Sequence, residues 1–174
     1  ARNVAQTAIA KGIPCVTEFF GQDLARRLAR EGHKADLLLG NNVLAHVPDI
    51  NDFVSGMKIL LKDDGVITME FPHLVRMVEE NQFDTIYHEH LCYYSMTALE
   101  RLFRRHGLVA VDVERLPIHG GSLRVFVSRG SGAPGARVQA LLDEESKLGM
   151  DRFEYYSSFA RRVAELKETL VREA

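Results

Sequence analysis

The sequence predicts an α/β domain with a mostly parallel sheet that ends in an antiparallel hairpin, followed by C-terminal helices. Short apolar runs alternate with amphipathic helical patterns from Ile13 to Leu116, which is the pattern of strands joined by helices. The segment 119–121 between the last two apolar runs is too short for a crossover helix, so these two strands should be antiparallel. Two further helical patterns follow Gly135.

The first half of the chain alternates between helix and strand. A helix at 22–31 is indicated by Leu24 and Leu28, one turn apart, and by Gly32 as a stop signal. The continuous apolar run at 35–40 is typical of a parallel strand covered on both faces. The expected elements, in order, are a helix near 4–9, a strand at 13–20, a helix at 22–31, a strand at 35–40, a helix at 48–60, a turn at 62–65 and a strand at 66–71.

The second half contains the hairpin and the terminal helices. Ser95 is a suitable cap for a helix with Leu99 and Phe103 on one face, and Gly107 ends that helix. The strands are expected at 108–116 and 122–128, with the last strand antiparallel beside 66–71, a joint at 131–135, and helices at 138–148 and 153–171. We therefore expect a domain at 1–129, a linker at 130–136 and a helical appendage at 137–174 that leads to a C-terminal domain.

Composition excludes several classes of protein. The 174 residues are 46% hydrophobic, so a normal core can form and a disordered tail is excluded. A net charge of -2 with interspersed signs argues against a nucleic-acid partner. No apolar run approaches the roughly 18 residues of a membrane span, and no signal peptide is recognisable. Cys15 and Cys92 lack a Cys-x-x-Cys spacing, which favours a reducing compartment and therefore the cytoplasm.

The residues 87–90 (YHEH) are the densest group of titratable side chains. They lie in an expected loop, where imidazole, carboxylate and phenol can together remove and return a proton near neutral pH. A solvated polar turn is the alternative interpretation. His88 and His90 have the i, i+2 spacing of paired metal ligands, but no third ligand has suitable spacing, so no metal site is predicted.

Other polar or aromatic groups follow the expected strands, at the edge where ligands of such sheets bind. Asn41 and Asn42 can bind a polar ligand or form a turn, and Phe19-Phe20 can flank a flat ring or join the core. His119 and Arg124 are candidates for contact with an anionic ligand.

Four segments in this order resemble one family. The motifs NNVLAHVPDI at 41–50, EFP at 70–72, YHEHLCYYS at 87–95 and HGGSLR at 119–124 resemble the class I S-adenosylmethionine-dependent C-methyltransferases of deoxysugar biosynthesis. The resemblance covers nearly the whole chain. It implies a Rossmann-like methyltransferase sheet and methyl transfer to C-3 of a nucleotide-linked 4-keto-6-deoxyhexose, with no membrane and no nucleic-acid partner; it leaves the oligomeric state unknown.

The resemblance also implies a role for each site residue. His90 would be the general base, with Tyr87 and Glu89 in the same active-site loop and His46 facing the acceptor sugar. The methionine part of S-adenosylmethionine would lie by Asn41, Asn42 and Val43, the adenine by Phe20, and the sugar nucleotide by Gly120 and Gly121. A shared pocket requires an irregular loop at 87–90, because in a regular strand Tyr87 and His90 would face opposite sides.

The family's zinc-binding N-terminal module, its Gly-rich first turn and the acidic residue ending the second strand are not recognisable in the sequence. We therefore expect a partial methyltransferase domain, truncated at its N-terminus, with zinc only in that absent module. Residues 1–21 should then pack weakly, because the strand at 13–20 lacks its usual neighbours. One alternative within the class is a methyltransferase that acts on another small ketone or hydroxyl. The alternatives from other classes are a non-catalytic Rossmann-like binding or interaction fragment, and a dehydrogenase, which would need a Gly-rich dinucleotide turn.

Overall fold

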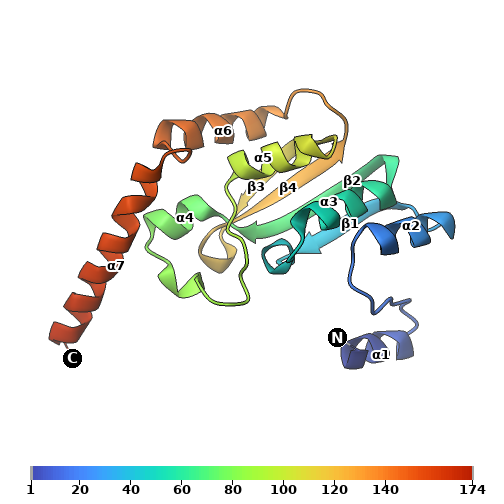
Figure 1. Ribbon diagram of the computed structural model, residues 1–174, viewed down its shortest axis with the longest axis horizontal. Coiled ribbons are helices and arrows are strands. Elements are labelled where there is room, and N and C mark those ends of the chain that lie inside the picture. Colours follow the sequence, from blue (N-terminus) through green and yellow to red (C-terminus); the bar gives the residue numbers. More distant parts are fainter. Residues whose placement is uncertain (1, 174) are drawn as a thin grey trace.

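The computed structural model describes residues 2–173, and its centre is a four-stranded mixed sheet (Figure 1). The strands are β1 (Ala35–Asn41), β2 (Leu61–Pro72), β3 (Leu108–Leu116) and β4 (Ser122–Arg129), in the order β1-β2-β4-β3. β1 pairs parallel with β2, whereas β4 is antiparallel to both β2 and β3. This arrangement confirms the α/β class, the hairpin, and the insertion of the last strand beside β2.

The described helices mostly cover one face of this sheet, along which α2, α3, α5 and α6 lie in Figure 1. Ser95 Oγ accepts a hydrogen bond from the Ala98 amide at 3.1 Å, so the expected cap of α5 is confirmed. The α-helices are α1 (Arg2–Ala10), α2 (Gln22–Arg30), α3 (Ile50–Leu60), α4 (Leu74–Glu79), α5 (Met96–Arg105), α6 (Ala136–Leu148) and α7 (Phe153–Glu173). Short 3-10 helices are η1 (Leu44–His46), η2 (Phe83–Thr85) and η3 (Ile118–Gly120). Among residues 2–173, no helix is long and apolar enough to cross a membrane.

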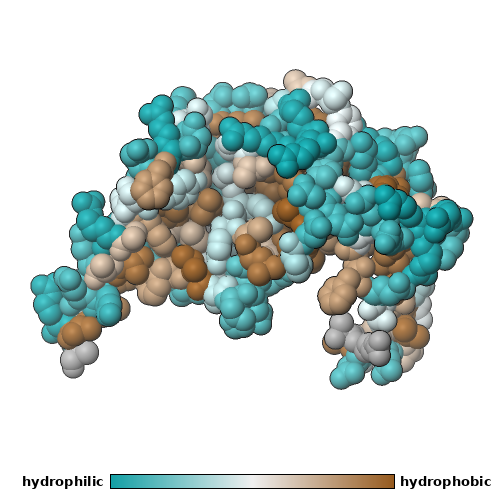
Figure 2. All heavy atoms as spheres, viewed as in Figure 1, coloured by the Kyte–Doolittle hydropathy of each residue, from teal (hydrophilic) through white to brown (hydrophobic). Residues whose placement is uncertain are grey.

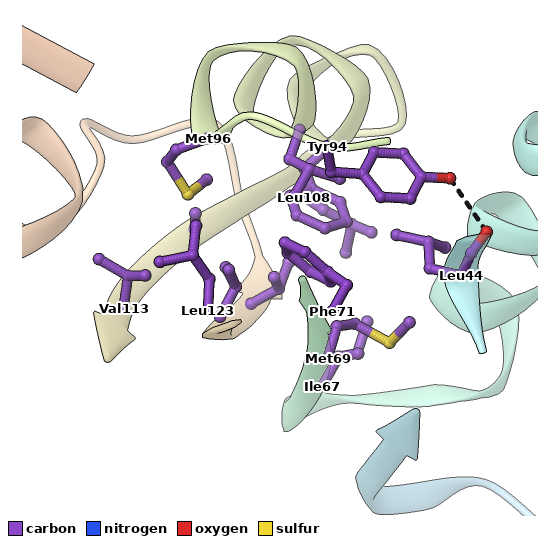
Figure 3. Close-up of a cluster of buried hydrophobic side chains, with 14 of the residues drawn as sticks. Leu44, Ile67, Met69, Phe71, Tyr94, Met96, Leu108, Val113 and Leu123 are labelled. Atoms are coloured by element: carbon purple, nitrogen blue, oxygen red, sulfur yellow. Dashed lines mark hydrogen bonds between the residues drawn. The ribbon is translucent and has the colours of Figure 1, made fainter. Parts of the chain in front are cut away.

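The core lies between the sheet and these helices. Alternate residues of β2, namely Ile67, Met69 and Phe71, point into it and are at most 1% exposed (Figure 3). Each such burial contributes about 1.5–3 kcal/mol relative to exposure. α6 also packs onto the core through Val138 and Leu141, which are 0% and 3% exposed. In Figure 2 the outward surface over α2 and along the top of the molecule is mainly hydrophilic, as expected for helices with one buried face.

The strand expected at 13–20 is wrong. These residues have no regular secondary structure, and Ile13, Val16 and Phe19 are 55%, 49% and 102% exposed. No described strand lies beside them to pair with their backbone groups, so the apolar run alone cannot form a strand. Of residues 3–21, Gly21 is the one that is buried, which agrees with the weak packing expected for this segment.

Two further expectations need correction. β1 is covered on one face by the described residues, since Leu37 and Leu39 are 53% and 71% exposed while Leu38 packs against the core. The residues 62–65, expected to form a turn, lie instead within β2. Ala35 of β1 pairs with Leu61, but Leu37, two residues later, pairs with Val66, so the pairing register shifts here. The extra residues are accommodated by this irregularity in the ladder rather than by ending the strand.

Candidate active site

A cleft of about 550 Å³ opens at the carboxyl ends of β1 and β2. This is the edge at which ligands of open α/β sheets bind. The lining residues come from the segment after β1, from the last two residues of β2, from η2 and the residues around it, and from η3. They are Asn42, Ala45, His46, Phe71, Pro72, Gln82, Asp84, Thr85, Tyr87, His90, His119 and Gly120.

The loop at 87–90 is irregular, as a shared pocket requires. The His90 amide donates to the Tyr87 carbonyl at 3.0 Å, which closes a tight turn. The turn brings the two side chains together, with Tyr87 Oη 3.0 Å from His90 Nε2 and their ring centroids 4.3 Å apart. In a regular strand these residues would lie on opposite faces, so the turn creates the phenol–imidazole pair.

Thr85 fixes the orientation of His90. His90 Nδ1 lies 2.9 Å from the Thr85 carbonyl oxygen, which can only accept a hydrogen bond. Nδ1 therefore carries a proton, and in the neutral ring Nε2 is the acceptor, facing the hydroxyl of Tyr87. A carbonyl behind one nitrogen and a lone pair on the other, here facing the exchangeable hydroxyl of Tyr87, is the arrangement of a general base.

His46 is oriented in the same way. Its Nδ1 lies 2.9 Å from the Glu89 carbonyl oxygen, and its ring centroid lies 5.0 Å from that of His90. This bond leaves Nε2 of His46 for a ligand. Glu89 thus contacts the site through its backbone, while its side chain is exposed and does not line the cleft.

Asn41 is the last residue of β1, and Asn42 and Val43 follow it. Asn42 has a left-handed φ of 53°, and its amide donates to the Glu70 carbonyl at 2.8 Å. Asn42 lines the cleft, Asn41 is exposed, and Val43 is 41% exposed. Polar amides and an apolar side chain are therefore presented together at this strand end.

Phe20 lies away from the cleft lining. Its ring packs edge-on against Phe53 of α3, with 5.3 Å between the ring centroids, and it contacts the hydrophobic core. Phe20 therefore takes the core position that was the alternative expected for it, although no described strand precedes it.

The two glycines expected at the sugar nucleotide occupy different positions. His119, Gly120 and Gly121 all have positive φ, of 50°, 73° and 105°. Gly120 lines the cleft, and its carbonyl accepts a hydrogen bond from Gln82 at 2.8 Å. The Gly121 carbonyl instead accepts from the His73 amide at 3.0 Å, so this glycine joins the loop to the end of β2.

The sequence suggests Arg124 as a contact for an anionic ligand, but in the structure its guanidinium is paired with a carboxylate. Its guanidinium donates to Glu70 Oε1 at 2.6 and 2.9 Å, and Glu114 lies 3.4 Å away. The hydrogen bond with Glu70 raises the pKa of Arg124 above its ordinary value, with a smaller contribution from Glu114. The two residues are cross-strand partners on β2 and β4, and Glu70 is buried whereas the Arg124 side chain is 39% exposed.

Sequence reasoning missed Thr85, Gln82 and Asp84, which all line the cleft. Thr85 acts through its carbonyl, a group that every residue type provides, so its side chain gives no signal. Within residues 2–173 no group of three or more His, Cys, Asp or Glu side chains is arranged to hold a metal ion.

Comparison with known proteins gives two consecutive family matches. Residues 5–113 match the family described as methyltransferase domain, and residues 117–174 match the C-methyltransferase C-terminal domain. The C-methyltransferase NovU of Streptomyces niveus is 37% identical over 162 residues, which are 92% of this chain and 39% of NovU.

Solved structures give weaker similarity. An O-methyltransferase family protein from Burkholderia thailandensis is 16% identical with a TM-score of 0.48, covering 76% of this chain and 40% of that one. The magnesium protoporphyrin IX methyltransferase of Synechocystis is 15% identical with a TM-score of 0.44, covering 59% and 48% of the two chains.

Proposed function

Because this chain belongs to the methyltransferase family, we propose that the protein containing it is an S-adenosylmethionine-dependent C-methyltransferase acting on a nucleotide-linked 4-keto-deoxysugar. The chain spans 39% of the length of the curated relative that it matches, so the proposal concerns the full-length protein. The observation that supports it most is the Thr85–His90–Tyr87 arrangement in the cleft, a positioned base of the kind that C-methylation beside a ketone requires.

The strand end at 41–43 fits the amino-acid part of the cofactor. The exposed amides of Asn41 and Asn42 are suited to its charged groups, and the exposed part of Val43 to its aliphatic chain. Phe20 is proposed to lie near the adenine, through the part of its half-buried side chain that stays exposed beside Phe53. When bound, S-adenosylmethionine supplies an electrophilic methyl group.

The residues of the cleft account for the acceptor chemistry. The C–H bond beside the ketone breaks, its proton goes to Nε2 of His90, and its electron pair forms the enolate of the sugar. The Thr85 carbonyl stabilises the resulting imidazolium through Nδ1. In the free site the Tyr87 hydroxyl donates a hydrogen bond to Nε2 of His90. Because a protonated Nε2 no longer accepts this bond, the hydroxyl becomes available as a donor to the enolate oxygen. The nucleophilic carbon would then take up the methyl group as the methyl–sulfur bond breaks, with the electron pair of that bond left on the sulfur.

Other proposed roles concern the surroundings of this chemistry. His46 faces the sugar, held by the carbonyl of Glu89. Gly120 and Gly121 allow the backbone to approach the sugar nucleotide, since both have a φ that a larger residue rarely adopts. The free cysteines Cys15 and Cys92 agree with a place in the cytoplasm.

The test is methyl transfer from labelled S-adenosylmethionine to a 4-keto-6-deoxyhexose nucleotide by the full-length protein and its His90→Asn variant. We expect the variant to lose at least about 100-fold in kcat, the usual contribution of a general base. His88→Asn is the matched control, because His88 is exposed and does not line the cleft. Normal turnover by His90→Asn removes His90 from its role, and a wild-type protein that does not bind S-adenosylmethionine supports the non-catalytic alternative.

A further inference from the structure

We propose that Glu145, a buried carboxylate on α6, is a positioning residue that holds two walls of the active-site cleft in register. This inference rests on the proposed function. Glu145 does not line the cleft, and it follows all the lining residues in the sequence, the last of which is Gly120. Its side chain is 0% exposed, and each of its oxygens accepts two hydrogen bonds.

The first wall is the loop that contains His90. Glu145 Oε1 accepts from the Met96 amide at 2.7 Å, and Oε2 accepts from the Thr97 amide at 2.7 Å and the Thr97 hydroxyl at 2.5 Å. These groups begin α5, directly after the loop. The carboxylate therefore fixes the point at which the active-site loop joins the helix.

The second wall is the segment 119–121. Glu145 Oε1 lies 2.9 Å from His73 Nε2, and the His73 amide donates to the Gly121 carbonyl at 3.0 Å. His73 also forms an isolated parallel bridge with Tyr94, and the Leu74 amide donates to the Tyr94 carbonyl at 2.9 Å. One carboxylate thus connects the loop after β2, the loop before α5 and the loop after β3.

The charge of Glu145 is retained in this site. Burial by itself raises the pKa of the carboxyl, but the hydrogen bonds from His73, Thr97 and Met96 outweigh it and leave the pKa below its ordinary value. A buried charge is costly even when fully hydrogen-bonded, and Ser95 already caps α5. The carboxylate is therefore better explained by the geometry that it imposes than by the stability that it adds.

The reaction requires such geometry, because Nε2 of His90 must reach the proton on the acceptor carbon, and that carbon must lie in line with the methyl–sulfur bond. A displacement of about 1 Å in a catalytic group can cost on the order of 100-fold in rate. Loosening the start of α5 moves the loop of His90, and loosening His73 moves the segment of Gly120. Both walls carry lining residues, so Glu145 acts on catalysis through them.

The experiment compares Glu145→Gln with Glu144→Gln in the full-length protein. Glu144 is the matched control, since it is adjacent, 48% exposed and paired with Arg115 at the surface. We expect Glu145→Gln to lower kcat per folded molecule about tenfold, with the KM for both substrates changed less than about twofold, because the contact acts on orientation. Amide exchange at 95–98 should accelerate while exchange at 67–69 stays unchanged.

Thr97→Val is the milder variant, which removes one hydroxyl donor and keeps both backbone amides. We expect a kcat loss of about threefold and faster exchange at 95–98. If Glu145→Gln does not fold, the kcat and the amide exchange of Thr97→Val test the role of Glu145. The inference is overturned if activity per folded molecule is unchanged, or if exchange at 95–98 does not respond. If the wild-type protein transfers no methyl group, the proposed function fails, and the exchange measurement alone decides whether Glu145 holds the loops.

Discussion

The hydrogen bond between Tyr94 and Leu44 offers a direct measure of how the loop before α5 is held against η1, the short helix that follows β1. Tyr94 is 6% exposed, and its hydroxyl donates to the Leu44 carbonyl at 3.0 Å (Figure 3). In Tyr94→Phe the ring remains, and so does its edge-on contact with Phe71 at 5.5 Å. The carbonyl keeps a long bond of 3.4 Å from the Val47 amide, so it is not left unpaired. The expected cost is therefore about 1 kcal/mol.

Tyr94→Ala removes the ring as well and should cost about 3–5 kcal/mol through the cavity that it leaves. The assay is equilibrium urea unfolding of the full-length protein, with amide exchange at 67–71 to report on this core locally. The pair of variants separates the hydrogen bond from the packing. Equal losses in Tyr94→Phe and Tyr94→Ala, or no loss in Tyr94→Phe, would refute the reasoning.

Two other changes test the packing and the electrostatics. Gly56→Ala usually gains up to about 1 kcal/mol in a helix, but here the added Cβ would lie 2.8 Å from the backbone carbon and oxygen of Gly21, so urea unfolding should show a net loss of stability. Burial lowers the pKa of His106 below the ordinary value of about 6.5, helped by Arg105 and Lys58. The unfolded chain then takes up the proton first, so stability falls as the pH drops below about 6.5, and His106→Gln should flatten this part of a pH series of unfolding curves. A variant curve parallel to the wild-type curve would contradict the role of His106.

Local signals explain why much of the fold could be predicted. The segment His119–Gly121 allows only a tight connection, which predicts the β3–β4 hairpin. The Ser95 side chain caps α5 by accepting a hydrogen bond from the amide of Ala98, three residues along the chain. The run at 13–20 has the same apolar character as a strand, but strand formation needs a partner, and partners are not local information.

The site residues also divide into those with a local sequence signal and those that depend on distant contacts. Tyr87 and His90 were predictable as a group because they are close in sequence, although their contact depends on the turn between them. His46 joins them from η1, directly after β1, where a polar residue that follows an expected strand gave a usable signal. Glu145 gave none, since a glutamate on an amphipathic helix is usually exposed, and only the packing of α6 brings it to the start of α5.

The connection through α6 bears on how the chain divides into domains. The two family matches meet between residues 113 and 117, within β3, yet β4 from the second match lies between β2 and β3 from the first. A sheet cannot be divided there without exposing the edge of β2. The boundary that we propose at 130–136 leaves the sheet intact, but α6 beyond it buries Val138 and supplies Glu145. The C-terminal region therefore contributes both a central strand and a buried carboxylate to the half that contains His90, and we expect a substitution of Glu145 in α6 to lower the proposed activity without touching the cleft.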